Sequence, residues 1–252
     1  MKHAVTGGWA LVAAGLAFAL VSLVRPDLAP AIAVVAIVLA AGALVVATQL
    51  DLAERHVIIG TAIVLGGFAG SWALDRGGSR HGMSLLATHA LAAAGGTAGI
   101  ALLIRLVRRR RNVGRETVVG DAVIVGLGSW LIGWVAFVKP TLEATSEPVL
   151  SSILGSLTHP IASVLLFVAA VALVADTSRS AASYAMAGAA LAIVASHFAV
   201  ALVDAGHVGG SGRTLTAALL AAAAMLLGGG LLLSARPDYD HPTVSDAHRL
   251  LT

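Results

Sequence analysis

Eight apolar stretches, separated by short breaks that hold most of the charged residues, divide the sequence along its whole length. Each stretch has 18 to 26 residues. Since an α-helix rises about 1.5 Å per residue, each is long enough to cross about 30 Å of hydrocarbon. The stretches are Gly7–Val24, Pro30–Leu50, Val57–Leu74, Leu85–Val107, Thr117–Val138, Leu150–Ala175, Ser183–Val203 and Thr214–Ser234. The sequence therefore predicts an all-α, polytopic integral membrane protein with about eight transmembrane helices.

The composition excludes a soluble globular protein. Of the 252 residues, 58% are apolar and 12% are charged, whereas about 25% of the residues of a soluble domain are charged. The same content of Leu, Val, Ile and Ala excludes a disordered chain. The sequence has no cysteine, which excludes disulfides, thiolate nucleophiles and Cys-ligated metal sites.

The distribution of basic residues predicts one orientation in the membrane. A cluster of arginines lies between the fourth and fifth stretches, and the positive-inside rule places it in the cytoplasm together with both termini. Eleven of the 16 Lys and Arg residues then lie on the cytoplasmic side and five on the other. We expect a multi-pass protein of the cell inner (plasma) membrane, with an arginine cluster that fixes topology and contacts lipid headgroups and that does not bind nucleic acid. The cluster consists of Arg105, Arg108, Arg109, Arg110, Arg111 and Arg115.

Matching residues at the ends of the stretches indicate an internal duplication. The first stretch ends in V-R-P-D-L (24–28) and the fifth in V-K-P-T-L (138–142), 114 residues later. An acidic residue shortly before a glycine ends the third and seventh stretches, at Asp75 and Asp204. We therefore predict two four-helix repeats, residues 1–112 and 113–236, and a short cytoplasmic tail over 237–252. Because four is an even number, the repeats would be parallel.

Two G-x-x-x-G motifs lie within apolar stretches, at Gly66–Gly70 and Gly95–Gly99. In a membrane helix this spacing lets two backbones approach closely, because glycine has no side chain. We expect these motifs to serve helix packing.

Two aspartates provide the clearest enzymatic alternative. Asp51 ends the second stretch and Asp121 begins the fifth, both on the predicted cytoplasmic side. Paired carboxylates can activate water, one as base and one as acid. Their placement resembles that of the prepilin peptidases, which are intramembrane-type aspartyl proteases. The chain lacks the Pro-Asn that follows the first acid in that family, and the first glycine and the lysine around the second. In the simpler interpretation, Asp51 lies at the membrane interface and Asp121 caps or packs a helix.

Histidines also occur within or near the stretches. His197 lies near mid-membrane, and His81, His89, His159 and His207 lie in the predicted outer half. Ionisable groups inside a membrane are costly and are often functional. No two of these histidines share a helix at an i, i+4 spacing, so we predict interhelical hydrogen bonds rather than a metal site, and no cofactor.

An ordered set of residues marks the second half of the chain. Arg115-Glu116, Asp121, Trp130 and Pro140 come first, and Thr158-His159-Pro160 opens an apolar run that ends at A-R-P-D (235–238). In this order they resemble the membrane-embedded sensory region that precedes cyclic di-GMP cyclase and phosphodiesterase domains in many actinobacterial proteins. The resemblance covers about residues 115–240. The 252 residues do not contain the catalytic output domains of that family, with their G-G-D-E-F or E-A-L signatures. We therefore expect either a free-standing module that works through a partner or the membrane part of a longer protein.

The resemblance implies a non-catalytic sensory or anchoring module in signal transduction. An extracytoplasmic or intramembrane cue would reach a cytoplasmic signalling partner through the last helix, and the chain would make or degrade no cyclic di-GMP. A homo-oligomer remains open, and the aspartyl protease is the alternative. A small-solute transporter is a third interpretation, disfavoured because the matching prolines lie at helix ends. As ligand or packing contacts we expect Asp121, Trp130, His159 and His197.

Overall fold

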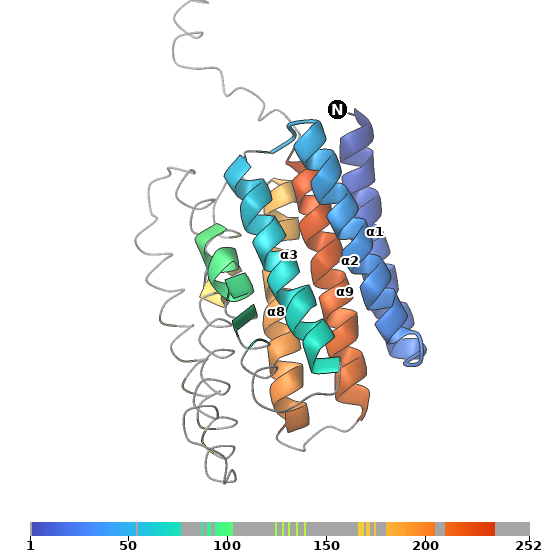
Figure 1. Cartoon of the computed structure of the whole chain (residues 1–252), viewed down its shortest axis with the longest axis vertical. Helices are drawn as coiled ribbons and strands as arrows, with labels where there is room; N and C mark the ends of the chain where they lie inside the picture. Colours follow the sequence, from blue (N-terminus) through green and yellow to red (C-terminus); the bar gives the residue numbers. More distant parts are fainter. Residues whose placement is uncertain are drawn as a thin grey trace, which may run out of the picture.

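The computed structural model describes residues 2–53, 55–76, 180–204 and 210–234, with shorter pieces at 87, 90–91, 94–102, 124, 128, 131, 135, 139, 166–168, 170–171 and 174. Five helices lie in the longer ranges (Figure 1), and no described residue belongs to a strand. The helices are α1 (Lys2–Val24), α2 (Ala29–Gln49), α3 (Arg55–Arg76), α8 (Ala181–Asp204) and α9 (Gly210–Leu233).

All five helices are long and apolar enough to cross a membrane. They coincide with the first, second, third, seventh and eighth predicted stretches. The protein is therefore an α-helical membrane protein with several helices that can span the bilayer. The fourth stretch is described only in part, mainly as a helical piece at 94–102, and most of the fifth and sixth stretches lie outside the described residues.

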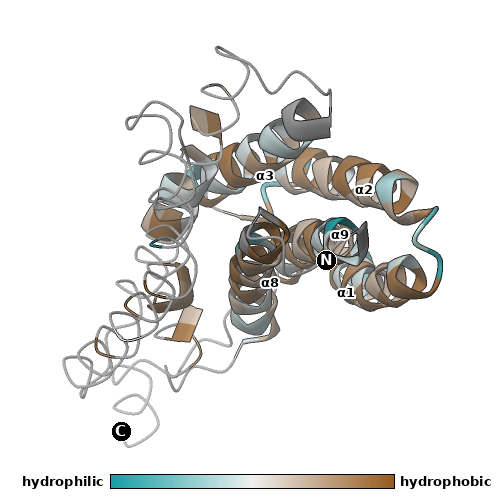
Figure 2. Cartoon of the chain, turned by 90° about the horizontal axis from the view of Figure 1, so that it is seen from below, coloured by the Kyte–Doolittle hydropathy of each residue, from teal (hydrophilic) through white to brown (hydrophobic). Residues whose placement is uncertain are grey.

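Helix α9 is the central helix of the described bundle. It packs against α1, α2 and α8, and makes a smaller contact with α3 (Figures 1 and 2). In its most apolar 18-residue window, 78% of the residues are buried, compared with 17% in α1 and 28% in α2. The last predicted membrane helix is thus shielded by helices from the start of the chain.

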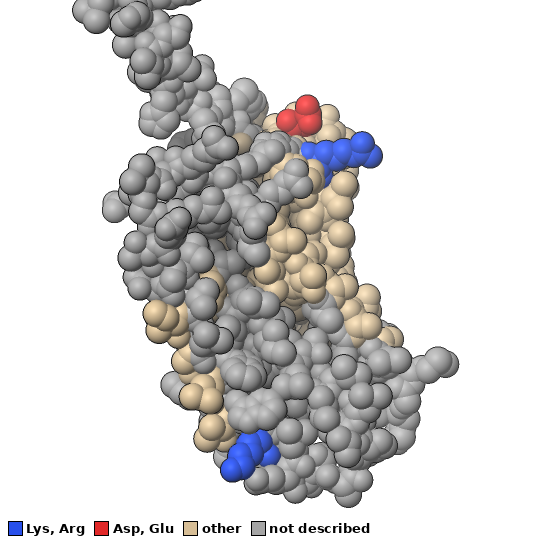
Figure 3. Space-filling view, turned by 90° about the vertical axis from the view of Figure 1, so that its left-hand side faces the viewer, with Lys and Arg blue, Asp and Glu red and all other residues tan. Residues whose placement is uncertain are grey.

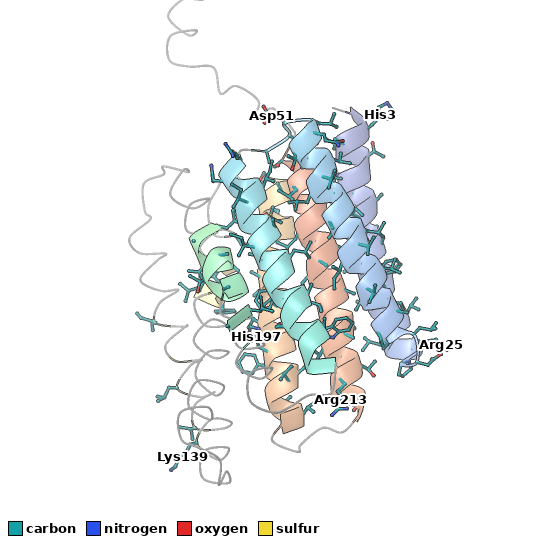
Figure 4. The ribbon with its side chains drawn as sticks, viewed as in Figure 1. His3, Arg25, Asp51, Lys139, His197 and Arg213 are labelled. Carbon is teal, nitrogen blue, oxygen red and sulfur yellow. The ribbon has the colours of Figure 1, made fainter. Side chains whose placement is uncertain are left out.

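Glycine contacts define the directions of the helices. Gly8 of α1 lies beside Gly229 of α9 and Gly15 lies beside Met225, so these two helices are antiparallel. The start of α1 and the end of α9 share one end of the bundle, which we call the His3 end. Arg25 and Arg213 mark the opposite end, the Arg25 end (Figure 4).

The two N-terminal helices bury small residues and expose large ones. In α1, between residues 3 and 24, the buried positions are seven residues apart. In α2 they alternate by four and three residues, and all five valines of that helix are exposed. This pattern suits helices that pack closely on one side and face lipid on the other. The buried positions are Gly8, Gly15 and Ser22 in α1, and Ala29, Ala33, Ala36, Ala40, Ala43 and Ala47 in α2.

A charged turn joins α1 to α2. Arg25 and Asp27 form a bidentate pair across Pro26, with Nε 3.2 Å from Oδ1 and Nη2 3.0 Å from Oδ2. The hydrogen bond from Arg25 lowers the pKa of Asp27 below its ordinary value. Pro30 occupies the first turn of α2, where its missing N–H leaves no helical bond unmade. The V-R-P-D-L motif therefore ends one helix and starts the next, while most of its predicted counterpart at 138–142 lies outside the described residues.

The predicted glycine motifs do make close helix contacts, at Gly70, Gly95 and Gly99, but Gly67 takes the place of Gly66. A Cβ on Gly67 would lie 2.8 Å from the Cα of Gly95, whereas Gly66 has open space around it. Gly60 faces Leu102 and Gly70 faces Leu91, so the 94–102 helix runs antiparallel to α3. The predicted role in helix packing is therefore confirmed for these segments, although Gly66 itself takes no part in it.

Candidate functional site

Three consecutive glycines of α9 each face a different helix. Successive residues of an α-helix point about 100° apart, so Gly228, Gly229 and Gly230 can serve three neighbours at one level. We call these three glycines and their contacts the α9 junction. It lies near the His3 end of the bundle, where α9 ends at Leu233.

A Cβ atom added to any glycine of the α9 junction would lie unusually close to an atom of the neighbouring helix. A Cβ on Gly228 would lie 3.1 Å from the Cα of Ala40 in α2. On Gly229 it would lie 2.9 Å from the carbonyl oxygen of Gly8 in α1, and on Gly230 it would lie 3.2 Å from the side chain of Met186 in α8. Two of the three contacts therefore bring backbone against backbone, and the third involves a flexible side chain.

The seam between α1 and α9 continues this close packing toward the Arg25 end. A Cβ on Gly15 would lie only 2.7 Å from the Cβ of Met225. One heptad further along α1, Ser22 is fully buried. Its Oγ has no hydrogen-bond partner within the described part of the chain. The seven-residue spacing of these small residues keeps one face of α1 against α9 for most of its length.

His197 lies on α8 and packs against α3. Its side chain is buried, and its ring centroid is 5.5 Å from that of Phe68, with the two rings tilted by 49°. The preceding residue, Ser196, donates its hydroxyl to the carbonyl oxygen of Ile193 at 2.7 Å. The described surroundings of His197 are thus an interhelical aromatic contact within the apolar core.

Asp51 lies at the His3 end, exposed, in the turn after α2 (Figure 4). Its φ of 49° is in the left-handed region. The N–H of Leu52 bonds to the carbonyl of Ala47 at 3.0 Å, and the N–H of Asp51 approaches that of Thr48 at 3.4 Å. These two bonds define a Schellman motif, with Asp51 at the position usually taken by glycine. The backbone of Asp51 thus ends α2, which is a structural role independent of its carboxylate.

The other predicted site residues lie outside the described residues. Asp121 is one of them, so of the predicted aspartate pair the structure describes Asp51. Within the described ranges, no group of three or more His, Asp or Glu side chains could hold a metal ion. The predicted site residues that lie outside the described ranges are Asp121, Trp130, His159, Arg105, Arg108, Arg109, Arg110, Arg111 and Arg115.

The α9 junction did not emerge from sequence reasoning. Its two signals were present: the G-G-G run at 228–230, and the seven-residue spacing of Gly8, Gly15 and Ser22. Neither signal indicates which helix a given glycine will contact, since small residues are common throughout this chain.

Comparison of the chain with protein-family models, with curated proteins and with solved structures found no match.

Proposed function

We propose that the chain is a non-catalytic sensory or anchoring module of a membrane signal-transduction system. It would carry a cue from the outer side, or from within the bilayer, to a cytoplasmic partner. The observation that carries this proposal is the central position of α9, which contacts three helices at the α9 junction and then leads into the C-terminal segment.

The close contacts of α9 make it a suitable transmitting element. Where backbone lies against backbone, a displacement of α1 or α2 cannot be absorbed by side-chain rotation and must move α9 as well. Helix α9 extends from Gly210 at the Arg25 end to Leu233 at the His3 end, so it connects the two ends of the bundle. A cue acts only if it binds or stabilises one helix arrangement better than another.

The proposal includes the predicted topology. With the His3 end in the cytoplasm, the start of α1 and the end of α9 lie on the same side, which requires an even number of crossings. Two parallel four-helix repeats satisfy this requirement. The resemblance to the sensory regions of cyclic di-GMP proteins fits the same arrangement, with an output domain that follows α9 in a longer chain or belongs to a partner protein.

A photo-crosslinking experiment in native membranes tests this proposal. A photoreactive amino acid replaces Tyr239, in the segment that follows α9. We expect it to capture a cytoplasmic protein, with a yield that changes severalfold when Gly229→Ala disturbs the α9 junction.

Gly42→Ala is the matched control, because Gly42 lies within α2 with open space around it. Its crosslinking yield should equal that of the wild type. Capture of no protein, or the same yield in folded Gly229→Ala as in wild type, would contradict the proposal.

A further inference from the structure

Two exposed aromatic side chains with polar groups on their rings lie at one level of the bundle, on different helices. Trp9 of α1 is 49% exposed and Tyr184 of α8 is 45% exposed. Gly8 lies beside Gly229 of α9, and Ala185 lies beside the next residue of α9. Since consecutive residues of a helix differ by about 1.5 Å in height, both aromatic residues lie at the level of the α9 junction.

The outward faces of α1 and α8 change from amphipathic to apolar side chains with depth. Leu16 and Leu191 follow Trp9 and Tyr184 by seven residues, or about two helical turns, so each leucine lies on the same face as the aromatic residue before it. Both leucines are exposed. Both helices run antiparallel to α9, from the His3 end towards the Arg25 end, so the leucines lie about 10 Å closer to the middle of the bundle.

Exposed arginines mark the opposite limit of the apolar layer. Arg25 follows α1, and Arg213 lies in the first turn of α9. Trp9 and Arg25 are 16 residues apart, as are Arg213 and Gly229, with no Asp, Glu, Lys or Arg between them in the sequence. Each interval corresponds to about 24 Å of helix, which approaches the roughly 30 Å of a hydrocarbon core when the reach of the arginine side chains is included. On the face drawn in Figure 3, the described acidic and basic side chains also lie only at the two ends.

We propose that Trp9 and Tyr184 lie at the boundary between the hydrocarbon layer and the phospholipid headgroups, which places the α9 junction at the same boundary. Trp and Tyr are enriched at membrane–water interfaces, because their rings are apolar while the N–H or O–H takes a hydrogen-bond partner. The carbonyl and phosphate oxygens of phospholipids accept such hydrogen bonds. The inference holds for any cue or partner of the module, so it does not depend on the proposed function.

Polar residues beyond this level fit the same boundary. His3 precedes Trp9 on α1 and is exposed. On α2, which passes the α9 junction at Ala40, the exposed Gln49 lies nine residues further towards the His3 end. Helix α9 ends about one turn beyond its junction, at Leu233. The segment that follows α9 therefore begins among the headgroups.

Single spin labels measure the depth of this level, because the sequence contains no cysteine. Labels are placed at four exposed positions, as Trp9→Cys and Leu16→Cys in α1 and as Tyr184→Cys and Leu191→Cys in α8. The full chain is reconstituted in vesicles of dioleoyl phosphatidylcholine. The accessibility of each label to oxygen and to a water-soluble nickel complex gives its depth. We expect equal, shallow depths at positions 9 and 184, and depths about 10 Å greater at positions 16 and 191.

A second pair of labels leaves both aromatic residues in place. Ala10→Cys and Ala17→Cys are exposed and seven residues apart on α1, so their depths should differ by the same amount. This pair decides the outcome if replacement of Trp9 itself displaces α1.

Equal depths at all four positions, or different depths at positions 9 and 184, would overturn the proposal, because the boundary would then lie at another level. Labels at positions 9 and 184 that neither reagent reaches would also overturn it, since a protein surface would then cover these positions. Failure of the proposed function is measured separately, by crosslinking from position 239 in native membranes.

Discussion

Gly8 of α1 and Gly229 of α9 are in backbone contact. A Cβ on Gly8 would lie 3.0 Å from the carbonyl oxygen of Gly229, and a Cβ on Gly229 would lie 2.9 Å from that of Gly8. The first and last described helices are therefore joined at a point where neither accepts a side chain. Such reciprocal contact gives a membrane protein its packing energy where no hydrophobic effect drives helices together.

The first prediction concerns this contact. We expect Gly229→Ala to destabilise the protein by about 1–3 kcal/mol, because overpacking forces the neighbouring backbone to shift. Gly42→Ala should leave stability unchanged or raise it by up to about 1 kcal/mol, since alanine favours a helix more than glycine does and the space is open. Thermal unfolding in bicelles measures both. Equal melting temperatures for the two variants would show that α1 and α9 do not pack as described.

The second prediction distinguishes the structural and chemical roles of Asp51. A left-handed conformation costs a residue with a side chain about 1–2 kcal/mol, and glycine avoids this cost. We therefore expect Asp51→Gly to be as stable as the wild type or more stable, Asp51→Asn to be unchanged, and Asp51→Val to be destabilised. Loss of function in folded Asp51→Asn would instead support chemistry at the carboxylate, as the aspartyl protease alternative requires.

The third prediction concerns buried hydroxyls. Thr61 of α3 is 1% exposed, and its Oγ1 has no hydrogen-bond partner among the residues that the structure describes. Thr61→Val removes this unsatisfied group at nearly constant volume, and we expect stability to be unchanged or to rise by about 1 kcal/mol. Ser196→Ala is the comparison, because its hydroxyl donates to Ile193 and its loss should cost about 0.5–1.5 kcal/mol. A large loss in Thr61→Val would reveal a partner for its hydroxyl.

The fourth prediction concerns pH. Arg25 lowers the pKa of Asp27 below its ordinary value of 3.8. A depressed carboxyl pKa stabilises the folded state above the unfolded-state pKa, and this contribution is lost as the pH falls through the folded-state value. We expect wild type to lose a small part of its stability below about pH 4 through this pair, and Asp27→Asn to lack that part of the pH dependence. The pair is exposed to solvent, so the difference should also shrink as salt is added. Parallel stability profiles for the two proteins would show that the pair does not form.

Much of the helical framework could be predicted from the sequence. The stretch Pro30–Leu50 is observed as Ala29–Gln49, and Ser183–Val203 as Ala181–Asp204, because a long apolar run between charged residues allows few alternatives. The main error in length is at the start of the chain, where the helix begins at Lys2 instead of Gly7. Polar residues at that point mark the edge of the bilayer but do not end a helix.

The position of α9 could not be predicted in this way. In a soluble helix the apolar face indicates the core, but in a membrane helix both faces are apolar, and hydropathy does not separate lipid contacts from helix contacts. Residue size does separate them in α2, where Ala36 and Ala40 are buried and Val35 and Val38 are exposed. Likewise, the sequence placed Asp51 at the end of a helix, whereas its left-handed conformation depends on the turn that follows.

Disulfide formation between α8 and α9 tests most directly that α9 is the shielded, central helix. A Cβ on Gly230 lies 3.4 Å from the Cβ of Ala185, close to the separation of about 3.5–4.5 Å in a disulfide. In membranes treated with a mild oxidant, the Ala185→Cys/Gly230→Cys variant should form an intramolecular disulfide rapidly. The Ala185→Cys/Gly42→Cys control, whose second cysteine lies on the outward side of α2, should form none. No disulfide in the first variant, or equal disulfide formation in both, would contradict the central position of α9.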